Sequence, residues 1–206
     1  MKNYSQHGEQ AHILKFFDGF KGRFLDLGAF DGVTGSNTRA LAELGWFGVS
    51  IEANPENFQT LLGKNLNGVD CVNAAVMPKA GLERFYFSAD QCGTCMENKN
   101  LQAILPVRSS YYVAAVTPQM IADKFGGDFD FISLDVEGVD LNVLLELSPV
   151  AKKAKLLCFE DSIPCHNFDP DYYNFMLEAA ASLGFKTLVA RTVPAQGGTG
   201  NTLVSR

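Results

Sequence analysis

The sequence predicts a three-layer α/β domain whose central sheet has seven mainly parallel strands. Apolar runs typical of buried strands alternate with helical patterns five times, as in parallel strands joined by crossover helices. The last two strands, 185–192 and 202–206, follow one another without a helix, so one antiparallel strand is expected near the C-terminus. A glycine turn follows the first strand in FLDLGAFDG (24–32), the position of a ligand-binding turn in such folds.

Size and composition indicate a single domain spanning residues 1–206. A hydrophobic content of 47% supports one sizeable core, and the length is too short for two large domains. The N-terminus lacks the apolar core of a signal peptide, and no run of 18 apolar residues occurs, so a cytoplasmic protein without a membrane partner is expected. A net charge of −6 argues against a nucleic-acid partner. Five cysteines without a regular framework favour reduced thiols.

Capping residues and turns place the elements of the first half. Residues 1–22 are expected to be a helical segment, capped by Ser5 or a neighbour. Gly45 has the position of a helix C-cap glycine, and Asn54 with Pro55 is typical of a helix start. The expected elements are a helix at 4–22, strand 24–27, helix 37–44, strand 47–53, a helix from 55, strand 70–77 and a hairpin strand at 83–88.

The second half contains one long irregular stretch, 89–112. A loop of this length inside a compact domain is either functional or mobile, and we expect it to lie on the substrate side. The remaining expected elements are a short strand at 113–116, helix 117–125, strand 129–136, helix 140–147, strand 155–159, helix 169–183 and the two final strands.

The turn after the first strand selects for a cationic cofactor. Dinucleotide folds need Gly-x-Gly-x-x-Gly, whereas Gly28 and Gly32 are separated by three residues. Asp26 and Asp31 bracket the turn, and each would repel a phosphate by about 4 kcal/mol at 4 Å and an effective dielectric near 20. S-adenosylmethionine (SAM) carries an ammonium and a sulfonium but no phosphate. The turn therefore predicts SAM, and the strand pattern then matches the class I (Rossmann-like) SAM methyltransferase fold.

Further candidate cofactor residues follow the other strands, because ligands of parallel sheets bind beyond the carboxyl ends. Glu52 lies 24 residues after Gly28, the distance expected for a carboxylate that accepts from ribose hydroxyls; its alternative is a solvated acid. The small residues of 73–75 leave room for adenine, or they are only strand interior. Asp31 is either a cofactor contact or a cap for the following turn. The candidates are Gln6, Asp26, Gly28, Ala29, Asp31, Asn37, Glu52, Ala53, Asn73, Ala74, Ala75 and Asp135.

Asp135 and Glu137 are the candidate catalytic residues. Alternation along a strand would point both to the same side, and paired carboxylates push their pKa values apart, so that one can act as a base near neutral pH. Methyl transfer requires an aligned acceptor and a nearby base. Asp135 is the first choice by position. The open alternatives are that either acid binds the SAM ammonium or caps the next helix.

Several motifs in the same order resemble the FkbM-type methyltransferase family. They are YSQHGE (4–9), FLDLGA (24–29), IEANP (51–55), NAAV (73–76) and DFISLDVEG (130–138). The resemblance spans nearly the whole chain and implies methyl transfer from SAM, often to a hydroxyl on a sugar or natural product. It also implies that the N-terminal segment covers the methionine end of SAM. We therefore expect O-methylation of a small-molecule or carbohydrate acceptor.

Two metal hypotheses arise from the remaining polar residues. Glu160 and Asp161, with Asp135, resemble the acidic set that binds Mg²⁺ in catechol-type O-methyltransferases, which raises the option of a divalent cation; pocket or surface acids are the alternative. The CxxC motif at 92–95 and the Cys-His pair at 165–166 suggest zinc, although a single CxxC is more typical of free thiols. The histidine of that pair is an alternative base.

Two rival functions stay open from the sequence. One is an NAD(P)-dependent oxidoreductase, which the aspartates of the turn disfavour. The other is a catalytically inactive SAM-binding module, against which the acid at position 135 and the long loop argue.

Overall fold

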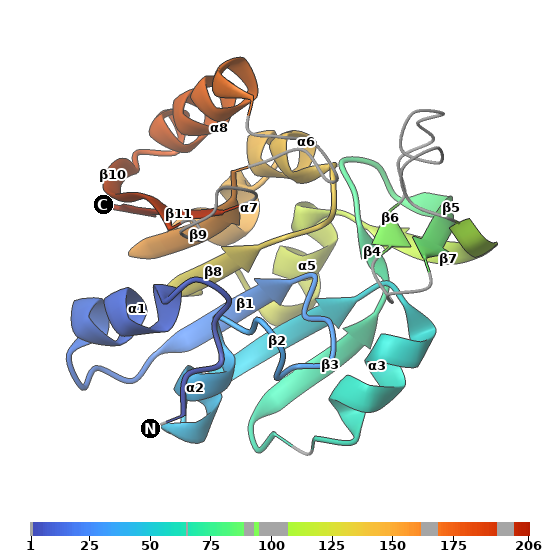
Figure 1. The fold of residues 1–206 in the computed structure, drawn as a ribbon, viewed down its shortest axis with the longest axis horizontal. Helices are drawn as coiled ribbons and strands as arrows, with labels where there is room; N and C mark the ends of the chain where they lie inside the picture. Colours follow the sequence, from blue (N-terminus) through green and yellow to red (C-terminus); the bar gives the residue numbers. More distant parts are fainter. Residues whose placement is uncertain (1, 65, 89–92, 95–106, 162–168, 193–199) are drawn as a thin grey trace.

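A computed structural model of the chain describes residues 2–64, 66–88, 93–94, 107–161, 169–192 and 200–206 (Figure 1). The main sheet has seven strands in the order β10-β11-β9-β8-β1-β2-β3. All neighbours pair in parallel except β11, which is antiparallel to both β9 and β10. The predicted sheet with one reversed strand near the C-terminus is confirmed. Its strands are β1 (Arg23–Leu27), β2 (Phe47–Glu52), β3 (Val69–Asn73), β8 (Phe131–Leu134), β9 (Leu156–Glu160), β10 (Lys186–Thr192) and β11 (Asn201–Ser205).

Helices cover both faces of this sheet, because successive side chains of each buried strand point to opposite faces. Leu25 and Leu27 of β1 pack in the larger core with α5, α6, α7 and α8, whereas Phe24 packs with α1 and α2. Helix α3 packs against β2 and β3. The helices are α1 (Glu9–Phe17), α2 (Arg39–Glu43), α3 (Pro55–Leu62), α5 (Pro118–Phe125), α6 (Asp140–Leu145), α7 (Ser148–Ala151) and α8 (Pro170–Ser182).

Local capping signals explain where several helices begin. The Asn54 side chain accepts from the Glu56 amide at 2.9 Å, and the Asp169 side chain accepts from the Asp171 amide at 2.9 Å. Both caps precede a proline at the first helical position, where the missing N–H has no cost. These starts agree with the sequence prediction.

A second, four-stranded sheet in the order β4-β7-β5-β6 was not expected. The predicted strand 70–77 divides into β3 and β4 (Ala75–Val76), and β4 leaves the main sheet to pair with β7 (Val107–Val116). The stretch 89–112 is therefore not irregular throughout, because β6 (Gly93–Thr94) and the start of β7 fall within it; residues 89–92 and 95–106 lie outside the described part. β5 (Gly81–Ser88) pairs antiparallel with β7, as the predicted hairpin requires.

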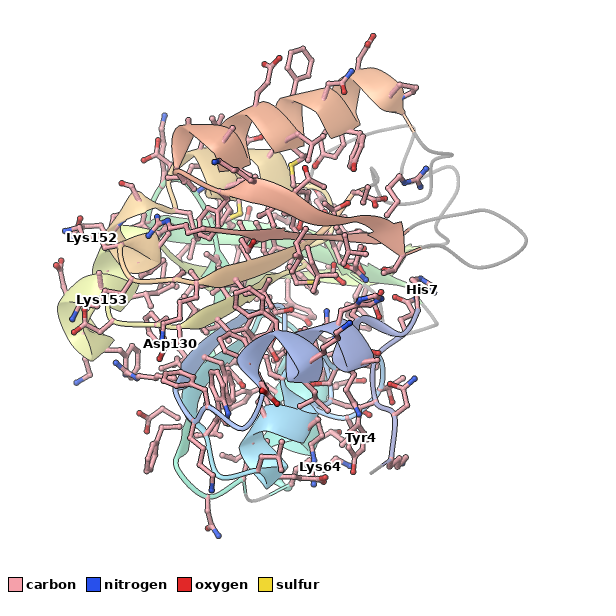
Figure 2. All side chains as sticks on the ribbon, turned by 90° about the vertical axis from the view of Figure 1, so that its left-hand side faces the viewer. Tyr4, His7, Lys64, Asp130, Lys152 and Lys153 are labelled. Carbon is pink, nitrogen blue, oxygen red and sulfur yellow. The ribbon has the colours of Figure 1, made fainter. Side chains whose placement is uncertain are left out.

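The N-terminal segment is less helical than predicted. Helix α1 begins only after Gly8, whose φ is 92°, and ends before Asp18, which also has a positive φ of 38°. Gly8, and not Ser5, holds the N-cap position of α1, although the Ser5 hydroxyl accepts from the amide of Gln10 in the first turn of that helix at 3.1 Å. Ser5 also bridges to Gly35 beside the glycine turn. In Figure 2, Tyr4 and His7 lie on the lead-in that precedes α1. This lead-in therefore packs against the glycine turn instead of forming part of a helix.

Candidate functional site

A cavity of about 530 Å³ lies beyond the carboxyl ends of β1, β2 and β8. β1 is the point at which the strand order reverses, because β2 lies on one side of it and β8 on the other. Most of the predicted site residues share this cavity, although they come from distant parts of the chain. Those that line it are Gln6, Asp26, Gly28, Ala29, Asn37, Glu52, Ala53, Ala74, Ala75, Asp135 and Glu137.

Gly28 is required by the close approach of two strand ends. Its φ is 86°, and a Cβ built on it would lie 1.7 Å from the carbonyl oxygen of Asp135. The amides of Gly28 and Ala29 both donate to the Ile51 carbonyl, at 2.9 and 3.0 Å, which fixes the turn against β2. A side chain at this position would force β1 and β8 apart and deform the cavity.

Asp31 and Asn73 are not among the residues that line the cavity. Asp31 Oδ1 accepts from the amides of Val33 (2.8 Å) and Thr34 (2.7 Å), so it caps its own turn, as the alternative interpretation held. Burial raises its pKa, but the hydrogen bonds from Thr34 and Val33 lower it below the ordinary value. The Asn73 side-chain amide donates to the carbonyls of Glu52 (2.8 Å) and Ala53 (3.1 Å). Both side chains satisfy nearby backbone groups and thereby shape the site indirectly.

Glu52 is buried at the end of β2, and the protein holds both of its carboxylate oxygens. Oε2 accepts from the Phe30 amide at 2.8 Å, and Oε1 accepts from the Asn54 amide at 2.7 Å. Burial raises its pKa, while these amides act in the opposite direction. Each carboxylate oxygen keeps a second lone pair, so a ligand hydroxyl can still donate to it.

A polar row crosses the sheet on the face covered by α1 and α2. Asp26 pairs in register with Ser133, and Thr38 Oγ1 donates to Asp26 Oδ2 at 2.5 Å. Burial raises the pKa of Asp26 to about 6, with hydrogen bonds from Thr38 and Ser133 acting against it. Asn37 Nδ2 lies 3.4 Å from Ser133 Oγ, whereas Asn37 Oδ1 is buried without a partner. This oxygen is therefore an unused acceptor on a residue that lines the cavity.

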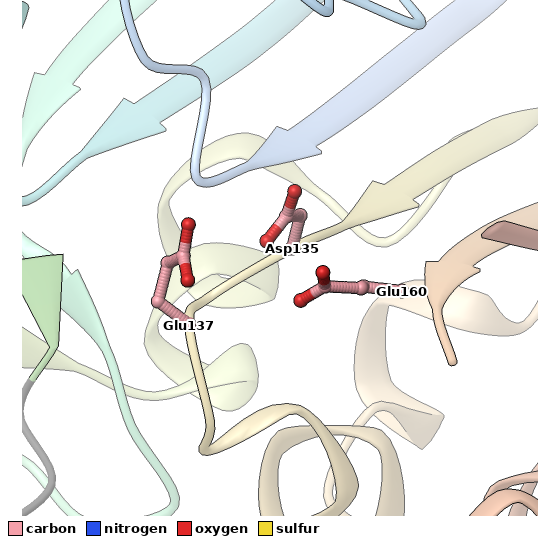
Figure 3. A group of neighbouring side chains, drawn as sticks. All are labelled: Asp135, Glu137 and Glu160. Carbon is pink, nitrogen blue, oxygen red and sulfur yellow. The ribbon is translucent and has the colours of Figure 1, made fainter. Parts of the chain in front are cut away.

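Asp135, Glu137 and Glu160 form an acidic cluster at the ends of β8 and β9. One carboxylate oxygen from each lies within 4.8 Å of the other two, and Figure 3 shows the three side chains facing a common space. Asp135 Oδ1 and Glu160 Oε2 are buried and make no hydrogen bond. Burial, followed by the charge of Glu137, raises the pKa of Asp135 well above its ordinary value; burial, followed by the charge of Asp135, does the same for Glu160.

The acidic cluster differs from the predicted set in one member. Asp161 is fully buried on the other side of the strand end, where Thr202 Oγ1 donates to it at 3.2 Å and Arg191 Nε lies 3.3 Å away. Glu137 takes its place in the cluster because the chain turns after β8 with a φ of 56° at Glu137. Asp140 holds this turn by accepting from the amides of Val136 (2.8 Å) and Gly138 (2.9 Å), whereas no side chain caps the first turn of α6.

Several cavity residues were not anticipated from the sequence. Ser133 precedes Asp135 by two positions on the same strand, so strand alternation was a usable signal. Asn57 is buried on the inner side of α3, and Phe85 comes from the second sheet, so neither has a local sequence signal. The CxxC motif at 92–95 and the Cys-His pair at 165–166 include residues outside the described part of the chain.

The N-terminal lead-in that carries Gln6 is anchored by Glu9. The Glu9 carboxylate is fully buried and accepts from Thr192 Oγ1 at 2.5 Å and from Asn201 Nδ2 at 3.1 Å. Burial raises the pKa of Glu9, but hydrogen bonds led by Thr192 bring it below the ordinary value. The segment that closes one side of the cavity is thus fixed to β10 and β11.

Comparison with known proteins connects this geometry to a family. The family described as "Methyltransferase FkbM domain" matches residues 26–187. No curated protein matches the sequence. Within the described residues, no helix has the length and apolar content needed to cross a bilayer.

Solved structures similar to this chain share its fold at low sequence identity. Fibrillarin from Aeropyrum pernix with natively bound SAM has a TM-score of 0.53 and 9% identity, over 90% of this chain and 67% of that one. The fibrillarin pre-rRNA processing protein from Methanococcus jannaschii has a TM-score of 0.53 and 16% identity, over 90% and 66%. An O-methyltransferase from Bacillus cereus, in complex with S-adenosylhomocysteine (SAH), has a TM-score of 0.52 and 14% identity, over 97% and 80%.

The likeness to these structures shows the class I SAM methyltransferase fold. The chain spans about two thirds of the length of the two fibrillarins. Because one similar protein is named for pre-rRNA processing, the comparisons do not support the sequence-based exclusion of nucleic acid. The fold therefore leaves the acceptor to be inferred from the site.

Proposed function

The chain belongs to the FkbM-domain methyltransferase family, and on this premise we propose that it transfers the methyl group of SAM to a hydroxyl oxygen of a small molecule or sugar. SAM dependence follows from the family and the fold. The acceptor class is our inference. The observation that carries it is the pair of acids, Asp135 and Glu137, at the edge of the cofactor cavity, because an attacking hydroxyl must lose its proton.

The cavity lining fits SAM better than a phosphorylated cofactor. Among the described residues that line it there is no Lys, Arg or His, whereas Asp26, Glu52, Asp135 and Glu137 all contribute carboxylates. These carboxylates would repel a pyrophosphate, and no cationic side chain among the described lining residues would offset that repulsion. The volume of about 530 Å³ lies within the usual range for small-ligand sites. The dinucleotide alternative therefore has no support in this lining.

Individual residues can be assigned to the parts of SAM. We assign Glu52 to the ribose hydroxyls, because its two oxygens are already oriented by backbone amides and retain acceptor capacity. We assign the unpartnered Asn37 Oδ1 to the ammonium group, which needs acceptors. The small side chains of Ala74 and Ala75 leave space for the flat adenine.

When bound, SAM supplies a methyl group activated by the sulfonium charge, and the residues around it must orient the acceptor and accept its proton. Asp135 suits the second task because burial raises its pKa well above the ordinary value, which makes the carboxylate a stronger base. Glu137 lies beside it and raises that pKa further. A positioned base of this kind contributes about 10²- to 10⁴-fold to a rate.

The test is release of SAH from SAM over a panel of acceptors. Glycosides and small alcohols are expected to be methylated, and a structured RNA transcript and an amine series are expected to be inert. Methylation of the RNA or the amines alone would contradict the proposal. SAM binding without turnover on any acceptor would instead favour the inactive binding module.

A further inference from the structure

The acidic cluster of Asp135, Glu137 and Glu160 is an arrangement that the chain itself leaves incomplete. Its three carboxylates approach within 4.8 Å, and two of their oxygens, Asp135 Oδ1 and Glu160 Oε2, are buried without any hydrogen-bond donor. Buried polar atoms are nearly always partnered, and a buried charge without a partner is costly. Three facing carboxylates with two unpartnered oxygens therefore indicate that a positively charged group belongs between them.

The described part of the chain does not supply that positive charge. None of its Lys or Arg side chains forms an ion pair with Asp135 or Glu160. Arg191, a basic residue on β10, has its Nε 3.3 Å from a carboxylate oxygen of Asp161. SAM is an insufficient substitute, because its ammonium is assigned to Asn37 Oδ1 and its sulfonium has no hydrogen to donate. Glu160, in addition, does not line the cofactor cavity.

We propose that Asp135, Glu137 and Glu160 bind a hard divalent cation, Mg²⁺ or Mn²⁺, at the edge of the SAM cavity. The donor set consists of carboxylate oxygens only, which favours such ions over zinc or copper. Oxygen ligands lie about 2.1 Å from Mg²⁺, so ligands on opposite sides of it are about 4.2 Å apart, which is compatible with the upper limit of 4.8 Å on the separations in the cluster.

This inference rests on the proposed function for its catalytic meaning. A cation held beside the methyl donor would take the acceptor oxygen as a further ligand and lower the pKa of that hydroxyl. The hydroxyl proton then leaves to solvent, the O–CH₃ bond forms as the S–CH₃ bond breaks, and the sulfonium becomes a neutral thioether. Asp135 and Glu137 would act as cation ligands when the ion is bound, and the role of Asp135 as the base in the proposed function applies to the protein without the ion.

The experiment measures Mn²⁺ binding to the full chain by electron paramagnetic resonance, with SAM binding measured on the same preparations by calorimetry. Glu160→Gln removes one ligand without touching the cofactor cavity, and Glu178→Gln is the matched control, because it removes an exposed carboxylate from α8. We expect one Mn²⁺ per wild-type chain, binding at least tenfold weaker in Glu160→Gln, and no change in Glu178→Gln. Addition of Mg²⁺ should displace the Mn²⁺.

Three results would overturn the cation site. They are no Mn²⁺ binding up to millimolar concentration by a wild-type protein that binds SAM, equal binding by Glu160→Gln, or equal loss in both variants. The thermal unfolding temperature without Mn²⁺ shows whether each variant is folded. Added Mn²⁺ should raise this temperature in the wild type and in Glu178→Gln but not in Glu160→Gln. Absence of SAM binding by the wild type would instead overturn the proposed function, so the two failures are distinguishable.

Discussion

Two acidic regions at the cavity differ in whether the protein donates hydrogen bonds to their carboxylates. At the end of β2, both oxygens of Glu52 accept hydrogen bonds from backbone amides. At the ends of β8 and β9, the acidic cluster has two oxygens that accept none. A carboxylate that is held by amides is oriented before the ligand arrives, whereas one without partners is stabilised only when a ligand arrives. The first region is suited to binding and the second to chemistry.

The largest expected effect is a fall in kcat when a carboxylate of the acidic cluster is removed. Asp135→Asn keeps the shape of the side chain but removes its charge, so we expect kcat to fall about 10²- to 10⁴-fold, as for loss of a catalytic base. SAM affinity should fall much less. SAH release at saturating SAM, together with calorimetric titration, checks both quantities. Unchanged kcat would make Asp135 a structural acid.

Asp26, in the polar row, should make the free energy of unfolding depend on pH. The folded-state pKa of Asp26 is raised to about 6 from 3.8, so its contribution to stability is present at pH below 4 and is lost as pH rises through 6. Asp26→Asn lacks this titration. We therefore expect the stability of the wild type relative to Asp26→Asn to fall by about 2–3 kcal/mol between pH 3.5 and pH 7.5. Urea unfolding of both proteins across this range measures it, and a constant difference would contradict the assignment.

The binding role of Glu52 is expected to give a somewhat smaller effect. Glu52→Gln should weaken SAM binding by about 1–3 kcal/mol, the scale for a hydrogen bond to a charged group. Because Glu52 does not belong to the acidic cluster, kcat at saturating SAM should change little. Calorimetry and initial rates separate the two readouts, and a loss confined to kcat would reverse the comparison between the regions.

Of these substitutions, Asp31→Ala should have the smallest effect on SAM affinity. Its carboxylate caps the turn through Val33 and Thr34 and does not line the cavity, so Asp31→Ala should cost about 1 kcal/mol of stability, as for loss of a cap. SAM affinity should change less than in Glu52→Gln. If Asp31→Ala weakened SAM binding as strongly as Glu52→Gln with unchanged stability, the direct contact predicted from the sequence would be restored.

The sequence predicted the main sheet well because each of its units has a local signal. The asparagine-proline start of α3 and the apolar run of β8 are both visible within about ten residues of chain. The second sheet was missed because β4 is only two residues long and its partner β7 lies far along the chain. The turn at Ala74 that divides β3 from β4 depends on that distant pairing.

The site was predictable where topology alone determines position. Parallel strands must end at the same edge, so Gly28, Glu52 and Asp135 could be placed together from sequence spacing. Asp31 and Asn73 bond to nearby backbone groups instead of lining the cavity, and sequence does not show which partner a short polar side chain will choose. Glu137 replaces Asp161 in the acidic cluster because Glu137 has a positive φ, which no sequence pattern predicted.

The contact between Glu9 and the last two strands has a consequence for how the protein is made. Thr192 and Asn201 are 183 and 192 positions downstream of Glu9. During synthesis, Glu9 can therefore make these two hydrogen bonds only after Thr192 and Asn201 have been added to the chain. A nascent chain that ends before Thr192 would contain the cavity residues but would lack the hydrogen bonds that fix the lead-in to β10 and β11.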